Sequence, residues 1–385
     1  MNRISVTLLI ACLCSLNLIS SNPTLGADRM DLLLPRIKDK KVALVVNHTS
    51  LLSNGEHLLD KLVAHKVDIK KIFAPEHGFR GLADAGETVK NGVDQRTGIS
   101  VISLYGANKK PTEPQMDDID VVIFDIQDVG ARFYTYISTM FYVMEACAQF
   151  GKEVIILDRP NPCDFIDGPV LEQEFASFVG IVPVPILHGL TVGELAKMIK
   201  GEGWIKSSDK CTLTVIPMLN WKHGQPYSLP TKPSPNLPNN RSIQLYASLC
   251  LFEATSISVG RGTSSPFQQL GGLDKRFGTF TFVPKSLPGF DKNPLHKDKT
   301  CYGIDLRSAT FPNGFTLKYL LEFSRLAGGI DEIITSRQAF NRLAGTSKLY
   351  DQILMGMNES EIKESWTVDL NKYKKIRIKY LIYKE

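Results

Sequence analysis

Carboxylates that follow short apolar runs are the residues of this sequence best suited to chemistry. Glu76 follows "KIFA" in "KIFAPEHGFRG" (71–81), Asp125 and Asp128 end "DIDVVIFDIQD" (118–128), and Glu87 lies between these two segments. Glycoside hydrolysis needs two carboxyl groups: a protonated one assists the leaving oxygen, and an ionised one acts on water or on the anomeric carbon. The residue types therefore permit acid–base cleavage of a glycosidic bond.

Other apolar runs also end in polar residues, among them Asp158, Asn161 and His188. Because parallel strands bring their carboxyl ends to one edge of a sheet, a single crevice could gather these side chains. A lone polar strand end is more often a cap or a turn. Along one strand, Asp125 and Gln127 share a face and Asp128 lies on the other, so only one of the two carboxylates is well placed for catalysis.

The runs that must position these residues are rich in Val and Ile, as buried strands are. They cover residues 40–50, 67–76, 99–106, 118–128, 152–162 and 182–189. Helical patterns lie between several of them, at 55–66, 134–151 and 191–203, where Thr191 and Glu194 form a predicted capping box. This alternation predicts an α/β fold with a doubly wound parallel sheet.

The second part of the chain has a different pattern. A Pro-rich segment (224–240) leads to a predicted helix at 242–255, a Gly-rich stretch at 258–272, a strand at 277–285, a helix at 316–326 and a basic strand at 372–384. We expect a catalytic domain at 28–235 and a smaller α+β domain at 236–385 that closes the cleft. The loop at 79–98 is long and lacks a helical period, as many functional loops do.

Residues 1–27 have the pattern of a signal peptide, with one early Arg, an apolar run and a small-residue end. The protein is therefore expected outside the cytoplasm, in the periplasm or the medium. "LIAC" (9–12) is an alternative lipoprotein box, with a lipid anchor on Cys12. No later stretch is apolar and long enough to predict an integral membrane segment in the mature chain.

Several other functions are disfavoured by charge and motif. The net charge of +5 is dispersed along the chain, which argues against a nucleic-acid partner. There is no HExxH or GxSxG motif, and "GRGT" (260–263) lacks the third glycine of a dinucleotide fingerprint. We predict neither a metal nor a cofactor, while a metal site assembled from several strand ends stays an alternative.

Eight ordered motifs between Lys40 and Gly272 carry a resemblance to a known family. They are "FAPEHGFRG", "AGE", "FDIQDVGARFYTYISTM", "LDRPNP", "DGPVLE", "HGLTVGELA", "PSPNLP" and "EATSISVGRGTSSPFQQLG". The set resembles the exo-β-N-acetylmuramidases of the NamZ type, formerly a domain of unknown function. The resemblance implies a Rossmann-like domain, a smaller second domain and a cleft whose catalytic glutamates are Glu76 first and Glu87 second. It also implies removal of non-reducing-end β-1,4-linked N-acetylmuramic acid from muropeptides or MurNAc–GlcNAc oligosaccharides.

On the basis of this resemblance we predict that Glu76 is the general acid and that Glu87 or Asp125 is the second catalytic group. Arg132 or Arg261 could bind the lactyl carboxylate that distinguishes muramic acid from glucosamine; the alternative is an ion pair with Asp128 or Glu253. The predicted substrate-binding residues are His77, Gln127, Asp128, Arg132, Tyr134, Asp158, Asn161, His188, Asn236, Glu253 and Arg261. Two rival functions stay open: a non-catalytic muropeptide-binding protein and a metal-dependent cell-wall hydrolase.

Overall fold

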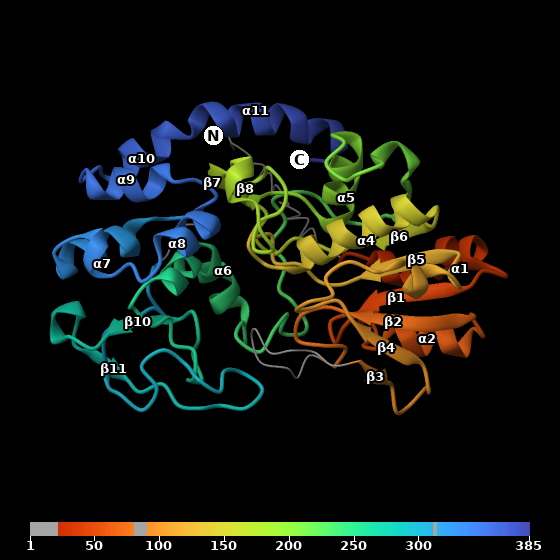
Figure 1. Ribbon diagram of the computed structural model, residues 1–385, viewed down its shortest axis with the longest axis horizontal. Coiled ribbons are helices and arrows are strands. Elements are labelled where there is room, and N and C mark those ends of the chain that lie inside the picture. The colour runs from red at the N-terminus through yellow and green to blue at the C-terminus, as the bar shows by residue number, and fades with distance from the viewer. Residues whose placement is uncertain (1–21, 81–90, 311–313) are drawn as a thin grey trace, which may run out of the picture.

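A seven-stranded sheet forms the centre of the N-terminal part of the computed structural model, which describes residues 22–80, 91–310 and 314–385 (Figure 1). Its strand order is β3-β4-β2-β1-β5-β6-β9, and every neighbouring pair is parallel except β3–β4. The strands are β1 (Val42–Val46), β2 (Ile69–Ala74), β3 (Gly92–Val93), β4 (Ser100–Ser103), β5 (Val121–Asp125), β6 (Glu153–Leu157) and β9 (Thr212–Ile216). Because the chain winds outward from β1 in both directions, the prediction of a doubly wound, Rossmann-like α/β sheet is confirmed.

Helices cover both faces of this sheet. In β1, Leu44 packs in a core with α1 (Met30–Ile37) and α2 (Leu58–Ala64). Val45 belongs to the opposite core, with α3 (Glu113–Met116), α4 (Tyr136–Phe150) and α5 (Val192–Gly201). Every residue of β1 is buried, which explains the uninterrupted apolar run in its sequence.

One predicted strand belongs to a different sheet, and one strand of the main sheet was not predicted. The run at 182–189 does form a strand, β8 (Pro185–His188), but it pairs antiparallel with β7 (Ile166–Val170) in a separate two-stranded ribbon. The strand that extends the main sheet beyond β6 is β9, which we did not predict. Only Ile216 of this strand is buried, while Thr212 is exposed and the three residues between them are half-buried, so β9 lacks the strong apolar signal of the central strands.

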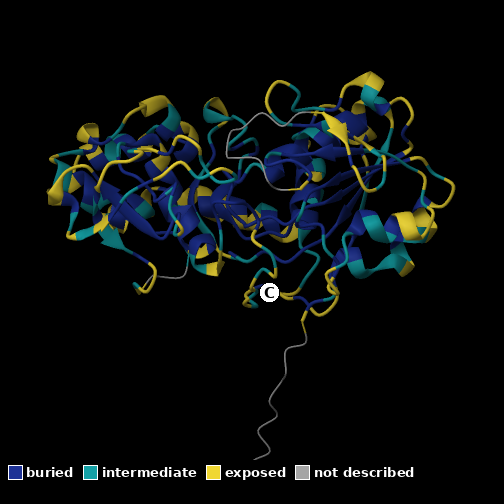
Figure 2. Cartoon of the chain, turned by 90° about the horizontal axis from the view of Figure 1, so that it is seen from below, coloured by how far each residue is buried: buried dark blue, intermediate teal, exposed yellow. Residues whose placement is uncertain are grey.

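The second part of the chain is α+β, as predicted. A three-stranded antiparallel sheet of order β10-β12-β11 lies among helices (Figure 1). Its elements are α6 (Asn240–Leu249), a 3₁₀ segment (Cys250–Ala254), β10 (Gln269–Gly272), β11 (Phe280–Phe282), β12 (Cys301–Asp305), α7 (Lys318–Ala327), α8 (Arg337–Ala344) and α9 (Lys348–Leu354). Buried residues of α6, α7 and α8 join the same core as α4 and α5, so one apolar interior runs through both parts (Figure 2).

The C-terminal segment is helical, and the prediction of a basic strand at 372–384 was wrong. After α10 (Glu359–Ser365), helix α11 (Thr367–Arg377) runs along the top of Figure 1 back toward the sheet. It buries Leu370, Tyr373 and Arg377, spaced as on one helical face. Tyr373 Oη donates to His188 O at 2.5 Å, and Arg377 Nε donates to Gly189 O at 2.8 Å, so this helix ties the two parts together.

The start of the described chain is also part of the fold. Leu25 and Ala27 are buried, at 4% and 0% exposure. Gly26 N donates to Asp158 O at 2.9 Å, and a Cβ at Gly26 would lie 2.4 Å from the backbone nitrogen of Asp158. Only glycine therefore fits this close approach. No helix in the described ranges has both the length and the apolar character that a membrane crossing requires.

Candidate active site

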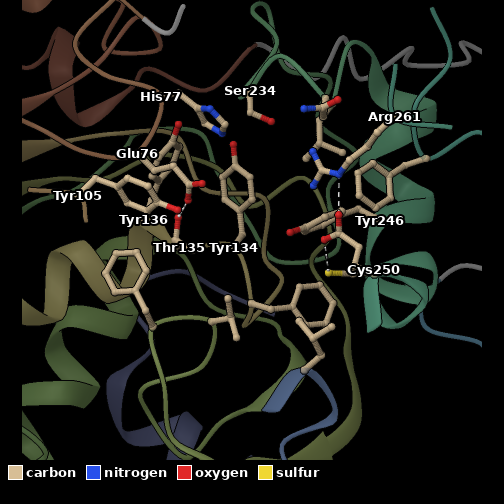
Figure 3. Close-up of a pocket in the computed structure, with 18 of the residues that line it drawn as sticks. Glu76, His77, Tyr105, Tyr134, Thr135, Tyr136, Ser234, Tyr246, Cys250 and Arg261 are labelled. Atoms are coloured by element: carbon tan, nitrogen blue, oxygen red, sulfur yellow. Dashed lines mark hydrogen bonds and ion pairs between the residues drawn. The ribbon is translucent and has the colours of Figure 1, made fainter. Parts of the chain in front are cut away.

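A cavity of ≈ 420 Å³ lies where the two parts of the chain meet (Figure 3). The sheet domain contributes the end of β2, the loop after β4 and the start of α4, and the second part contributes α6 and the segments that follow it. Its lining residues are Glu76, His77, Tyr105, Gly106, Lys109, Phe133, Tyr134, Thr135, Tyr136, Phe178, Val179, Ser234, Asn236, Leu237, Tyr246, Cys250, Glu253, Arg261, Phe267 and Leu343. Two carboxylates, Glu76 and Glu253, thus line the cavity from different domains.

A tight turn at the end of β2 directs Glu76 into this cavity. Gly78 N donates to Pro75 O at 3.0 Å, and His77, the third residue of the turn, has φ = 67°. A positive φ at the third position is typical of a type II turn, where glycine or asparagine is usual. Histidine in this conformation is strained, and such strain is found at functional sites.

Two hydroxyl groups hold the Glu76 carboxyl. Thr135 Oγ1 lies 2.6 Å from Glu76 Oε2, and the Tyr105 hydroxyl is also hydrogen-bonded to Glu76. Burial, together with the charge and the hydrogen bond of Glu76, raises the pKa of Tyr105 well above its usual value. Tyr105 therefore keeps its proton at any working pH. A hydroxyl both donates and accepts, so these contacts can serve Glu76 whether it is protonated or ionised.

The opposite wall carries an ion pair. Arg261 Nε donates to Glu253 Oε1 at 2.6 Å, and the guanidinium lies 5.1 Å above the centre of the Phe267 ring. Burial lowers the pKa of Arg261, but the charge and hydrogen bond of Glu253 raise it overall. Cys250 Sγ lies 3.5 Å from Glu253 Oε2, and burial and Glu253 hold the pKa of this thiol well above its usual range. Cys250 is consequently a neutral thiol and not an activated nucleophile.

One buried acceptor on the cavity wall has no partner among the described residues. Asn236 Nδ2 donates to Phe290 O at 2.9 Å, which leaves Asn236 Oδ1 unsatisfied although the residue is only 3% exposed. An unsatisfied buried polar atom costs about 1–3 kcal/mol. A ligand hydroxyl or amide in the cavity would remove this cost, which favours a polar ligand such as a sugar.

The cavity brings together part of the predicted site. Glu76, His77, Tyr134, Asn236, Glu253 and Arg261 all line it. Glu87 lies outside the described residues. The roles of these residues stay predictions.

The structure places Asp125, which we predicted as a catalytic residue of the cleft, outside the cavity. Arg159 donates to both of its oxygens, from Nε to Oδ1 at 2.6 Å and from Nη2 to Oδ2 at 2.8 Å. Asp125 is 0% exposed and Arg159 4% exposed, and Asp125 does not line the cavity. Its carboxylate is therefore a buried structural anion rather than a catalytic group.

Arg132, which we predicted as a substrate-binding residue, also lies outside the cavity lining. Its side chain is fully buried, and its guanidinium donates to four backbone carbonyls at 2.7–2.9 Å, those of Pro169, Val184, Leu343 and Ala344. No carboxylate of the described residues pairs with it, and burial lowers its pKa to about 9. Arg132 does not line the cavity; instead it fastens the β7–β8 ribbon to the C-terminal end of α8.

The remaining predicted ligands are structural as well, and none of them lines the cavity. Gln127 Nε2 donates to Pro160 O at 2.8 Å, and Asp128 Oδ2 accepts from Gly130 N at 2.7 Å. Asn161 Nδ2 donates to Leu190 O at 3.1 Å, and His188 Nδ1 accepts from Leu190 N at 3.2 Å. These residues shape the turns that follow the strands.

Asp158 anchors the two chain ends. Its carboxylate accepts from Gly193 N at 2.8 Å, from Thr191 Oγ1 at 2.8 Å and from Tyr383 Oη at 2.6 Å. Asp158 is 0% exposed and does not line the cavity. It therefore acts as a helix cap and a C-terminal anchor, not as a ligand for substrate.

Sequence reasoning missed several lining residues, notably Lys109, Thr135 and Tyr246. The run "RFYTY" (132–136) was the available signal for Thr135, because aromatic faces and hydroxyl groups suit a sugar ring. Tyr246 lies on α6, where its spacing looks like that of any buried helical residue. Nothing in its local sequence separates a cavity wall from a core.

The fold and the cavity define a class: a two-domain α/β protein with a carboxylate-lined polar cavity between a Rossmann-like domain and a smaller one. Residues 42–241 match the family described as "Exo-beta-N-acetylmuramidase NamZ, N-terminal", and residues 244–383 match "Exo-beta-N-acetylmuramidase NamZ, C-terminal". The chain belongs to this family.

Individual relatives agree with that assignment. The chain is 37% identical over 381 residues to the peptidoglycan beta-N-acetylmuramidase NamZ of Bacillus subtilis (strain 168), covering 92% of this chain and 90% of that protein. Two crystal structures of DUF1343 family proteins from Bacteroides fragilis are similar. One, at 1.30 Å resolution, has a TM-score of 0.87 and 41% identity over 95% of this chain and 100% of its own. The other, at 1.65 Å, has a TM-score of 0.81 and 27% identity over 94% and 99%.

Proposed function

We propose that this protein is an exo-acting glycoside hydrolase that removes non-reducing-end, β-1,4-linked N-acetylmuramic acid from peptidoglycan fragments. Beside family membership, the observation that carries the proposal is the cavity itself. It places Glu76, held by two hydroxyl groups, on one wall and the Glu253–Arg261 pair on the other. Its ≈ 420 Å³ is at the small end of ligand pockets, which span about 300–1,000 Å³, and suits a single substituted sugar.

We propose different tasks for the two walls. Glu76, fixed at a strand end, is the residue to transfer a proton to the leaving oxygen. Glu253 is an ion-paired carboxylate, and its negative charge can stabilise the positive charge that develops on the sugar ring. Tyr134 and Tyr246, whose ring centres are 5.9 Å apart, supply an aromatic surface between the walls.

The test is turnover by wild type and the Glu76→Gln variant, each on two substrates. One is a MurNAc–GlcNAc disaccharide, a poor leaving group, and the other is an activated aryl β-N-acetylmuraminide. If Glu76 is the acid, turnover of the disaccharide falls by roughly two to four decades, because glutamine cannot donate the proton. The loss on the aryl substrate is much smaller, since a good leaving group needs less protonation. Equal losses would assign Glu76 to nucleophile, base or binding.

A control and two further conditions separate the rival functions. Glu364→Gln changes an exposed glutamate of α10, outside the cavity, and should leave both rates unchanged. A muropeptide-binding protein would bind the disaccharide without turning it over. Turnover that EDTA abolishes would indicate the metal-dependent hydrolase. Release from an aryl β-N-acetylglucosaminide but not from the muraminide would refute the proposed specificity.

We also propose that the protein is exported, with cleavage before Asn22 or lipidation at Cys12 rather than cleavage after Ala27. Cleavage after Ala27 would remove buried Leu25 and Ala27 and the hydrogen bond from Gly26 to Asp158. Burying a leucine side chain alone is worth about 1.5–3 kcal/mol, so loss of this segment would weaken the fold. Mass spectrometry of the mature N-terminus decides; a chain that starts at Asp28 would refute this cleavage position.

A further inference from the structure

One lysine of the cavity, Lys109, has no carboxylate partner in the part of the chain that the structure describes. Two long-chain cations, Lys109 and Arg261, line the cavity. Arg261 is neutralised by Glu253 at 2.6 Å. The ammonium of Lys109 has no carboxylate partner among the described residues, and its contact is the ring of Phe178, with Nζ 4.8 Å from the ring centre. A cation over an aromatic face is attracted by the ring, which positions the ammonium but leaves its N–H donors available to an anion.

Lys109 is held on the same wall as Glu76. Phe178 stacks on Tyr142, with ring centres 6.4 Å apart and an interplanar angle of 14°, and lies 5.9 Å from Tyr105, which bonds Glu76. The loop that carries Lys109 is fixed at its start, because Leu104 N donates to Ala74 O at 2.8 Å. The strand end that presents Glu76 therefore also positions the loop of Lys109.

The neighbouring lysine has a different role. Lys110 Nζ donates to Glu145 Oε2 at 2.7 Å and to Gln149 Oε1 at 2.8 Å, both on α4, and Lys110 does not line the cavity. The two adjacent lysines thus differ: Lys110 forms a partly buried ion pair with α4, whereas Lys109 lines the cavity and pairs with no carboxylate of the described residues. Lys110 is the matched control for Lys109.

We infer that Lys109 is the specificity-determining residue that binds the lactyl carboxylate of the muramic acid ring. The inference rests on the proposed function, since that carboxylate is the group that separates muramic acid from glucosamine. An anion placed beside Arg261 would also meet the negative charge of the Glu253 carboxylate paired with it, whereas Lys109 has no paired carboxylate among the described residues. This assignment differs from the sequence-based prediction that Arg132 or Arg261 binds the lactyl carboxylate.

The experiment compares wild type and Lys109→Met on three aryl substrates: the β-N-acetylmuraminide with a free carboxylate, its methyl ester, and the β-N-acetylglucosaminide. A charge-assisted hydrogen bond is worth about 1.5–3 kcal/mol, so kcat/KM on the free acid should fall roughly 10- to 100-fold, mainly through KM. The rate on the ester should change less than about threefold, because the ester makes no ion pair. Lys109→Arg should recover most of the activity on the acid. Lys110→Met should keep the wild-type ratio of acid to ester.

Calorimetric titration with free N-acetylmuramic acid and N-acetylglucosamine separates this inference from the proposed function. Equal losses of Lys109→Met on acid and ester, or a selective loss in Arg261→Met instead, would overturn the role of Lys109. If wild type hydrolyses no muraminide but binds muramic acid in a Lys109-dependent way, the inference stands and the proposed function falls. If wild type neither binds muramic acid nor hydrolyses the muraminide, both are refuted.

Discussion

The hydrogen bond between Thr135 and Glu76 can be removed with little change in shape by the substitution Thr135→Val. Thr135 is the N-cap of α4, but its side chain makes no capping hydrogen bond, and its hydroxyl contacts Glu76 Oε2 at 2.6 Å instead. Valine keeps the β-branched shape and deletes only the hydroxyl. The substitution therefore changes the support of Glu76 without removing a helix cap.

The expected loss follows from the number of hydroxyl groups that hold Glu76. A hydrogen bond to a charged group contributes about 1.5–3 kcal/mol, and Tyr105 continues to hold the carboxyl after Thr135 is changed. We therefore take the lower value, about 1.5 kcal/mol, which corresponds to roughly a tenfold fall in kcat/KM. The loss should lie in kcat, because Thr135 orients the acid rather than the substrate. The free energy of unfolding should change by less than about 1 kcal/mol.

The assay is steady-state hydrolysis of the MurNAc–GlcNAc disaccharide by three variants. Thr139→Val is the matched control, because Thr139 lies one turn further along α4, is buried and does not line the cavity. Its hydroxyl donates to Thr135 O at 3.5 Å and to no other described residue. It should retain the wild-type kcat. Thr135→Ser restores the hydroxyl and should recover most of the rate. If Thr135→Val and Thr139→Val are equally active, Thr135 does not position Glu76.

Two further predictions concern buried basic residues that stabilise the fold. Arg132→Met leaves four buried carbonyls without their donor, so the free energy of unfolding in urea should fall by roughly 3–5 kcal/mol. An unchanged midpoint of urea unfolding would show that the free energy lost in burying the guanidinium equals the free energy gained from its hydrogen bonds. Burial lowers the pKa of His223, but hydrogen bonds to Asp164 and Glu194 raise it overall to about 9 from 6.5. The stabilisation by His223 is therefore complete below pH 6.5 and is lost as pH rises to about 9, so the melting temperature should fall across this window and His223→Gln should flatten the fall.

The central strands could be predicted because burial on both faces leaves an unmistakable sequence pattern. β1 and β5 are buried at every position, and their apolar runs are continuous. β8 has a similar run and was placed in the wrong sheet, because an apolar run records burial but not the identity of the pairing strand. β9 was missed because it lies at an edge, where half-buried residues such as Thr214 are sufficient.

The C-terminal error has a different physical origin. "KYKKIRIKY" (372–380) alternates apolar and basic residues in part of its length, which is the signature of a half-exposed strand. The helix forms because Leu370, Tyr373 and Arg377 share one face and because Tyr373 and Arg377 find carbonyl partners at His188 and Gly189. Those partners are distant in sequence, so the local pattern could not reveal them.

Some of the predicted site residues, such as Glu76, line the cavity, and others, such as Asp125, do not. Glu76 and Asp125 both end apolar parallel strands, and sequence alone gave them the same status. The structure separates them by what lies beyond each strand end. Asp125 is bound by Arg159, whereas Glu76 lies within a strained turn that lines the cavity. Two carboxylates that follow apolar strands thus differ in their surroundings through Arg159, which lies 34 positions from Asp125.

Residues that do not line the cavity hold its two walls in position. Glu76 belongs to the sheet domain and Glu253 to the second domain, and Arg132, Tyr373 and Arg377 are among the contacts that fix one against the other. Loss of Arg132 should therefore reduce stability and turnover together, because it loosens both walls. Loss of the Thr135 hydroxyl should reduce turnover alone, because it acts on Glu76 within one wall. This difference separates the residues that hold the cavity in shape from those that act inside it.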